Sequence, residues 1–150
     1  MVLYGMDATF DSRLRLKDSS AHGTGTTVGQ VDGADASLYI GAGRVKGEVK
    51  INVTACDVAS TDEVYKIQLV GNADGAWGST HVLAELTLGV AASIPNQVNK
   101  TTGFYSLPFI NAAPLTAGAE PSYLGYLRIR TIGSGTTPSV TYEAWVAKDE

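Results

Sequence analysis

Hydrophobic and polar residues alternate along much of the chain with the period of two that is typical of β-strands. In RVKGEVKINVTA, residues 44–55, Val49, Ile51 and Val53 share one parity, while lysine, glutamate and asparagine fill the other. A helix would spread these apolar positions around its circumference, because successive residues turn by about 100°, whereas a strand gathers them on one face. The pattern therefore predicts a half-buried strand over residues 45–55.

The same alternation is clear in VYKIQLV, HVLAELTL, YLRIRTI and SVTYEAWVA, and weaker over residues 13–17, 26–31, 36–40 and 103–109. Pro108 cannot donate a ladder hydrogen bond, which predicts an edge strand or a bulge there. Arg128 and Arg130 are expected to face outward. The residues predicted to be buried are Tyr65, Ile67, Leu69, Val82, Ala84, Leu86, Leu88, Leu127, Ile129, Val140, Tyr142, Ala144 and Val146.

Glycine-rich breaks separate these segments, and no stretch of a dozen residues has the apolar spacing of an amphipathic helix. Most of the 17 glycines fall in breaks such as GTGTT, DGAD, GAG and GSGTTP. Short strands with turn signals and no intervening helices are typical of a β-sandwich or barrel. We expect one all-β domain over residues 1–150, an antiparallel β-sandwich of about eight or nine strands.

Composition excludes several classes of partner. The net charge of −4 and the pI near 5.1 leave no general positive field for phosphates, so nucleic acid is not expected. The single cysteine, Cys56, allows no internal disulfide. The first residues lack the pattern of a secretory signal, and no apolar run approaches the ~20 residues that cross a bilayer. We expect a protein made in the cytoplasm, with no membrane partner.

Motifs for catalysis are missing or incomplete. GAGRVKG has one residue too many between its last two glycines for a dinucleotide fingerprint, and it leads into a predicted strand where a helix is required. His22 and His81 have no second ligand at metal-binding spacing. No G-x-S-x-G motif is present to support a nucleophile. The sequence predicts no enzyme, no catalytic residue, no metal and no cofactor.

Acidic residues occur in three loop segments. Loops that converge at one end of a sandwich can build an oxygen cage for calcium, which is one interpretation. Short acidic side chains are also enriched in turns because they bind nearby backbone N–H groups, and this interpretation is favoured. The residues concerned are Asp32, Asp35, Asp57, Asp62, Glu63 and Asp74.

The stretch GNADGAW, residues 71–77, is interpreted as a turn between two strands. Trp77 is then expected to plug the end of the sandwich or a subunit interface. A second interpretation treats several aromatic residues as a platform for stacking sugars, although aromatic residues along strands are ordinary core material. The members of that platform would be Trp77, Phe104, Tyr105, Tyr123 and Tyr126.

Four segments in order carry a family resemblance: YIGAGRVKGEVKINVTA, YKIQLVGNADGAWGSTHVLAELTLG, FYSLPF and YLGYLRIRTIGSGTTPSVTYEAWVAKD. From about Asp11 onward, the chain resembles the small jelly-roll capsid cement, or decoration, proteins of tailed bacteriophages. The resemblance implies a jelly roll that is not an enzyme, binds the outside of the head and bridges subunits of the major capsid protein. It implies a virion protein that self-associates as a dimer or trimer. The alternative is a carbohydrate-binding sandwich module of a phage adhesion or tail protein.

The residues expected to contact the capsid or another subunit fall into two groups. The segment 1–12 is either an extended N-terminal arm lying along a neighbour or a strand tucked into its own sandwich. The outward basic residues that follow it, Arg13, Arg15 and Lys17, form either a docking stripe for an acidic partner or a solvated strand face, and the solvated face is favoured. The loops at residues 72–78 and 111–121 form the second group, because sandwich loops gather at the ends of the fold. The predicted contact residues are Leu3, Tyr4, Phe10, Arg13, Arg15, Asn72, Asp74, Trp77 and Leu115.

Overall fold

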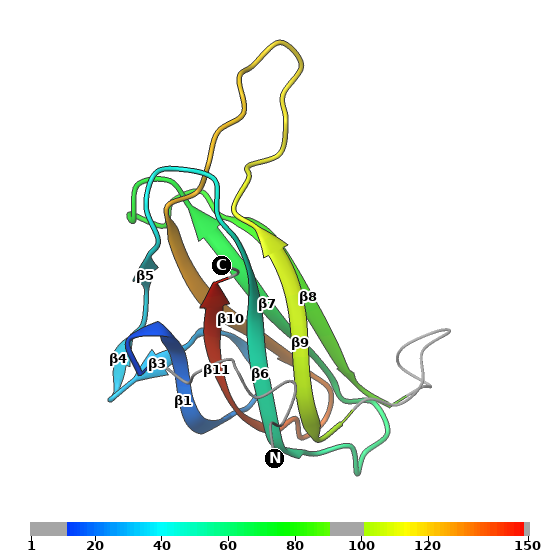
Figure 1. Ribbon diagram of the computed structural model, residues 1–150. Helices are drawn as coiled ribbons and strands as arrows, with labels where there is room; N and C mark the ends of the chain where they lie inside the picture. Colours follow the sequence, from blue (N-terminus) through cyan, green and yellow to red (C-terminus); the bar gives the residue numbers. More distant parts are fainter. Residues whose placement is uncertain (1–11, 91–100, 149–150) are drawn as a thin grey trace, which may run out of the picture.

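The computed structural model describes residues 12–90 and 101–148, nearly all of whose regular structure is antiparallel strand (Figure 1). This confirms the all-β prediction. The elements are η1 (Ser12–Leu14), β1 (Arg15–His22), β2 (Gly25–Val28), β3 (Gln30–Val31), β4 (Ala34–Asp35), β5 (Leu38–Tyr39), β6 (Lys46–Cys56), β7 (Val64–Asn72), β8 (His81–Gly89), β9 (Gly103–Ile110), β10 (Tyr126–Ser134) and β11 (Val140–Lys148).

Two sheets pack face to face. Sheet A has the order β1-β11-β6-β9, and sheet B has the order β2-β10-β7-β8, with β5 also paired to β10. If only the eight strands of four or more residues are numbered along the chain, these orders are 1-8-3-6 and 2-7-4-5. The chain changes sheet at every step between these strands except the β7–β8 hairpin. This is the arrangement of a jelly roll, so the predicted fold is confirmed.

The core lies between the inner faces of the two sheets. Val49 and Ile51 of β6 face Ile67 and Leu69 of β7, and all four are at most 1% exposed. Each such side chain contributes roughly 1.5–3 kcal/mol by leaving water. The Tyr142 hydroxyl is paired with that of Thr131, so this buried polar group has a partner. The apolar parity in the sequence therefore locates the core.

The prediction that Val82 is buried is wrong. Val82 is 46% exposed, whereas Leu83 packs against the core. Leu69 pairs with Ala84 but Val70 pairs with Val82, so Leu83 is an extra residue in β8. A β-bulge of this kind reverses the parity of the residues beyond it, which turns Val82 to the outer face of sheet B.

Loops from both sheets meet at one end of the sandwich. The Asn111 side chain accepts a hydrogen bond from the Val45 amide at 2.7 Å and donates to the carbonyls of Gly43 and Leu124. The turn after β7 and the long loop between β9 and β10 lie at this same end (Figure 1). The predicted edge strand is also confirmed, because Pro108 lies in β9, the last strand of sheet A. Within the described ranges, no helix has the length and apolarity to cross a membrane.

Candidate functional site

The predicted contact residues lie in several separate places. Leu3, Tyr4 and Phe10 fall outside the described residues. Arg13 is exposed in η1, and the half-buried Arg15 pairs with Asp18 at 2.8 Å. Leu115 is 76% exposed in the long loop before β10. The structure brings together Asn72, Asp74 and Trp77, which occupy one turn.

The turn between β7 and β8 is held by the side chain of Asn72, which is 3% exposed. Its Oδ1 accepts hydrogen bonds from the amides of Asp74 at 3.0 Å and Gly75 at 2.6 Å, and its Nδ2 donates to the Ser79 carbonyl. The Asp74 carboxylate accepts from the Ala76 amide at 2.9 Å. These local bonds satisfy the backbone of the turn. The interpretation of GNADGAW as a turn is confirmed.

Trp77 has a strained backbone and a stacked ring. Its φ of 61° lies in the left-handed region, where a bulky residue is an outlier. The ring lies under the Arg128 guanidinium, whose central carbon is 4.1 Å from the ring centroid. Such a cation–π contact contributes about 0.5–2 kcal/mol, depending on how far it is removed from water. The turn therefore folds back onto sheet B instead of extending from it.

Around this stack, the solvent side of sheet B carries an ordered set of planar side chains. Gln68 Oε1 accepts hydrogen bonds from Arg130 Nε at 2.9 Å and from Arg130 Nη2 at 2.6 Å. Gln68 Nε2 in turn donates to the Glu85 carboxylate at 2.6 Å. Across a neighbouring part of the sheet, the Tyr126 and Tyr39 rings have centroids 4.8 Å apart. We call this surface the Trp77 face, defined by Tyr39, Gln68, Trp77, Tyr126, Arg128 and Arg130.

The five aromatic residues considered for a sugar platform do not share one face. Trp77 and Tyr126 belong to the Trp77 face, but Tyr105 packs against the core. Phe104 lies near Trp145, with ring centroids 5.7 Å apart, in sheet A. The grouping is wrong because Phe104 and Tyr105 lie in β9 of sheet A, whereas Trp77 and Tyr126 lie on sheet B, and adjacent residues of a strand also point to opposite faces. Tyr39 of β5, which is 60% exposed, is an aromatic member that this grouping missed.

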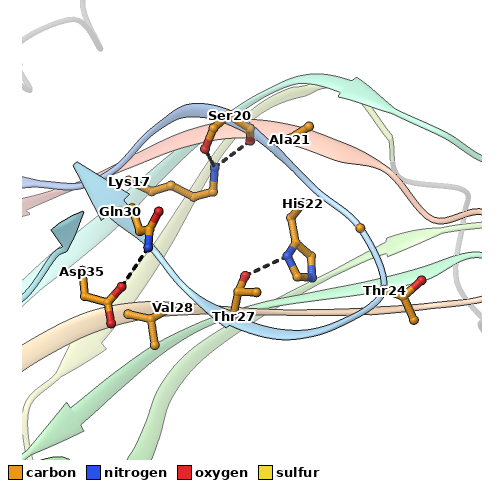
Figure 2. A pocket seen from close by; sticks show the side chains of 10 residues that line it. Lys17, Ser20, Ala21, His22, Thr24, Thr27, Val28, Gln30 and Asp35 are labelled. Atoms are coloured by element: carbon orange, nitrogen blue, oxygen red, sulfur yellow. Dashed lines mark hydrogen bonds between the residues drawn. The ribbon is translucent and has the colours of Figure 1, made fainter. Parts of the chain in front are cut away.

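A polar cleft opens between β1 and β2, the edge strands of the two sheets (Figure 2). Its volume is about 490 Å³, and its lining includes Lys17, Ser20, His22, Thr27, Gln30 and Asp35. Lys17 was expected to face outward with Arg13 and Arg15, but it is 4% exposed, because β1 shifts register between Arg15 and Lys17. Its Nζ lies between 2.7 and 3.2 Å from four acceptors: the carbonyls of Asp18, Ser20 and Tyr142 and the Ser20 hydroxyl. Burial lowers the pKa of Lys17 to about 8, and the Asp18 carboxylate partly opposes this shift.

His22 in the same cleft uses both of its ring nitrogens. Nε2 lies 3.1 Å from the Gly25 carbonyl, which can only accept, so Nε2 carries the proton. In the neutral ring, Nδ1 then accepts a hydrogen bond from the Thr27 hydroxyl at 2.7 Å (Figure 2). The imidazole links β1 to the start of β2 across the open edge of the sandwich. The bonds of His22 and Lys17 give both residues a structural role in this cleft.

The acidic residues mostly serve turns. Asp57 accepts from the Ala59 amide at 2.9 Å, and Asp62 accepts from the amide and hydroxyl of Thr136 at 3.0 and 2.7 Å. These hydrogen bonds from Thr136 lower the pKa of Asp62. Within residues 12–90 and 101–148, no three His, Cys, Asp or Glu side chains come together in a way that could hold a metal ion. The turn interpretation is thus confirmed for Asp57, Glu63 and Asp74, which bind nearby backbone amides, whereas Asp62 links two separate loops.

Arg128 was not predicted to be a contact residue, although its outward orientation was expected. Alternation of apolar and polar residues in YLRIRTI reveals the outward parity, but the Trp77 ring comes from a turn about 50 residues earlier in the chain. Burial lowers the pKa of Arg128, the Asp35 carboxylate opposes this shift and Arg130 adds to it. A guanidinium keeps its charge at neutral pH because its ordinary pKa is so high.

Comparison of the chain with models of known protein families, with curated proteins and with solved structures found no match. Function is therefore inferred from the side chains on the surface of this jelly roll. The Trp77 face combines aromatic rings, arginines and an ordered polar row, and these groups suit recognition of another surface.

Proposed function

We propose that this protein is a non-enzymatic capsid decoration protein of a tailed bacteriophage. It binds the outside of the head through the Trp77 face and bridges subunits of the major capsid protein. The observation that carries the proposal is the Arg128–Trp77 stack beside the Tyr126–Tyr39 pair on one side of sheet B. Trp, Tyr and Arg are the residues most enriched among those that dominate protein–protein binding energy.

A second line of support is the order of this face before any partner binds. Gln68 is 7% exposed and fixes Arg130, while the Asn72 network fixes the turn that carries Trp77. Side chains held in place in the free protein lose less conformational entropy on binding. The proposal includes self-association as a dimer or trimer, which would multiply modest contacts on a lattice of capsid subunits.

Co-sedimentation with expanded, undecorated heads of the same phage tests this function. The wild-type protein should pellet with the heads and raise their melting temperature, because a ligand that binds only the assembled shell stabilises it. Trp77→Ala should weaken binding, and Phe104→Ala is a matched control because it removes an exposed ring near Trp145 in sheet A. Lack of binding by the wild-type protein would refute the proposal.

A carbohydrate-binding role is the second candidate, and the Trp77 face also supports it. Exposed aromatic rings can stack on sugar rings, and Tyr39 is 60% exposed beside Tyr126. A glycan array would then show binding that Tyr39→Ala or Trp77→Ala abolishes. Binding to glycans without binding to heads would favour this candidate over capsid decoration.

A further inference from the structure

One cation on the Trp77 face has no acceptor in the part of the chain that the structure describes. Arg128 makes neither a hydrogen bond nor an ion pair with any described residue. Its Nε is covered by neighbouring atoms and has no partner among them, whereas the two terminal nitrogens are not covered in this way. Partly buried charges normally have a partner, because removing them from water is unfavourable. The terminal end of Arg128 is therefore available to an external acceptor.

Arg130, the neighbouring arginine on the same face, differs from Arg128 because it donates hydrogen bonds within the sheet. Arg130 lies two residues further along β10, and two of its nitrogens donate to Gln68, which in turn donates to Glu85. Arg130 is thereby fixed by the sheet itself. Arg128 is positioned by the Trp77 ring, which supplies a flat surface but no lone pairs. Stacking fixes the plane of the guanidinium and leaves its donors free.

The turn that carries Trp77 maintains this arrangement against backbone strain. A non-glycine residue in the left-handed region costs roughly 1–3 kcal/mol when it is held there by its surroundings. At Trp77, with φ of 61°, the turn is held by the three hydrogen bonds of Asn72. A strained residue persists only where the surrounding structure holds it in place, and such residues are concentrated at binding sites.

We propose that Arg128 anchors a carboxylate of the partner, from an aspartate or glutamate exposed on a segment of the capsid protein. This inference rests on the proposed function and names the chemistry of its contact. The two terminal nitrogens match the two oxygens of a carboxylate, which a lysine ammonium cannot do. The Trp77 ring covers one face of the guanidinium and would shield the ion pair from water, which strengthens it. The acidic Glu85 is already bound to Gln68 on the same face.

A peptide titration tests the carboxylate site without the capsid. Hexaglutamate is added to the full-length protein, with hexaglutamine as the uncharged control, and the indole NMR signals of Trp77 and Trp145 are followed. Hexaglutamate should shift the Trp77 signal, Trp145 should not respond, and Arg128→Gln should abolish the shift. Lys66→Gln removes an exposed charge from another part of sheet B and should preserve it. Absence of a Trp77 shift, or its persistence in Arg128→Gln, overturns the inference.

Head binding then separates this inference from the proposed function. Arg128→Gln and Arg128→Lys should each weaken co-sedimentation about tenfold or more, and Lys66→Gln should stay within about twofold of wild type. If wild type and Arg128→Gln bind heads equally, the carboxylate site is refuted and the decoration function stands. If wild type binds hexaglutamate but not heads, the function fails and the site stands. Preference for a sulfated glycan such as heparin over hexaglutamate refutes the choice of a protein carboxylate.

Discussion

Lys17 and Arg128 are two cationic side chains that differ in whether their donors have hydrogen-bond acceptors within the described residues. Lys17 lies in the cleft between β1 and β2, with four acceptors around its Nζ and the Tyr142 ring 4.4 Å away. Arg128 lies on the Trp77 face with a ring beneath it and no acceptor among the described residues. A cation whose donors are used internally supports the fold. A cation that is fixed in place with free donors can bind an external acceptor, as we propose for Arg128.

The strongest test of this contrast compares truncation of the two side chains. Lys17→Ala removes a buried stem and leaves the carbonyls of Ser20 and Tyr142 without this donor, so it should lower the free energy of unfolding by about 3 kcal/mol. Arg128→Ala should lower it by less than about 1 kcal/mol, because only the stack is lost. Urea denaturation measures both values. Equal losses would show that Arg128 is as structural as Lys17.

The pH dependence of the free energy of unfolding tests the burial of Lys17 separately from that of Arg128. Its pKa is about 8 in the folded protein and has an ordinary value of 10.5, so between these values the unfolded chain binds more protons. The contribution of Lys17 to stability should therefore rise with pH across this window, by about 2 kcal/mol at pH 9.5 relative to pH 7. Arg128 contributes nothing here because it stays charged.

This measurement is made in a Cys56→Ser background. Burial raises the pKa of the Cys56 thiol from 9.0 to about 11, which makes stability fall with pH over part of the same range. Lys17→Met in that background should remove the rise in the free energy of unfolding. A rise that persists in Lys17→Met would assign the effect to another group.

The turn that positions the Trp77 ring can be loosened without touching either cation. Asn72→Ala removes two bonds to backbone amides and one to the Ser79 carbonyl, and should cost about 1.5 kcal/mol of unfolding free energy. Asn72→Asp keeps the acceptor for the amides of Asp74 and Gly75, so its loss should be smaller. Thermal unfolding gives both values, and a larger loss in the aspartate variant would contradict this account of the turn.

Truncation of the Trp77 ring should have a smaller effect than loosening of the turn. Trp77→Ala should cost about 1 kcal/mol, because it removes the stack on Arg128 while leaving the backbone in the left-handed region. Trp77→Gly also loses the stack but relieves the strained φ, so it should be at least as stable as Trp77→Ala. Calorimetry compares the two variants directly. Lower stability in the glycine variant would show that the backbone strain at Trp77 is negligible.

Much of the fold could be predicted because the alternation of apolar and polar residues in each strand identifies the face that is buried. Val49, Ile51 and Val53 share one parity and are all buried, and a proline in a strand predicted the edge position of β9. Val82 was misplaced because a single extra residue, Leu83, reverses the parity in β8. The segment HVLAELTL does not reveal that bulge, because Val82 and Leu83 are both apolar and either of them could face the core.

The candidate site could be predicted only in part. Asn72, Asp74 and Trp77 were expected in a turn because short polar residues and glycine favour tight reversals. The acceptor-free Arg128 was not identified, because alternation shows that a side chain points outward but not which atoms surround it. The other residues of the Trp77 face come from β5, β7, β10 and the turn after β7, which the alternation within one strand does not bring together.

By itself, the sequence determined that this chain forms an antiparallel sandwich with a core drawn from alternate residues and with turns at its polar, glycine-rich breaks. These properties are local, because periodicity and turn chemistry act over a few residues. Only the tertiary structure decided that Trp77 lies under Arg128 and that the amine of Lys17 is enclosed by acceptors from β1 and β11. Hydrogen bonds and ring contacts act over a few ångströms, and only folding brings residues from distant parts of the chain within that range.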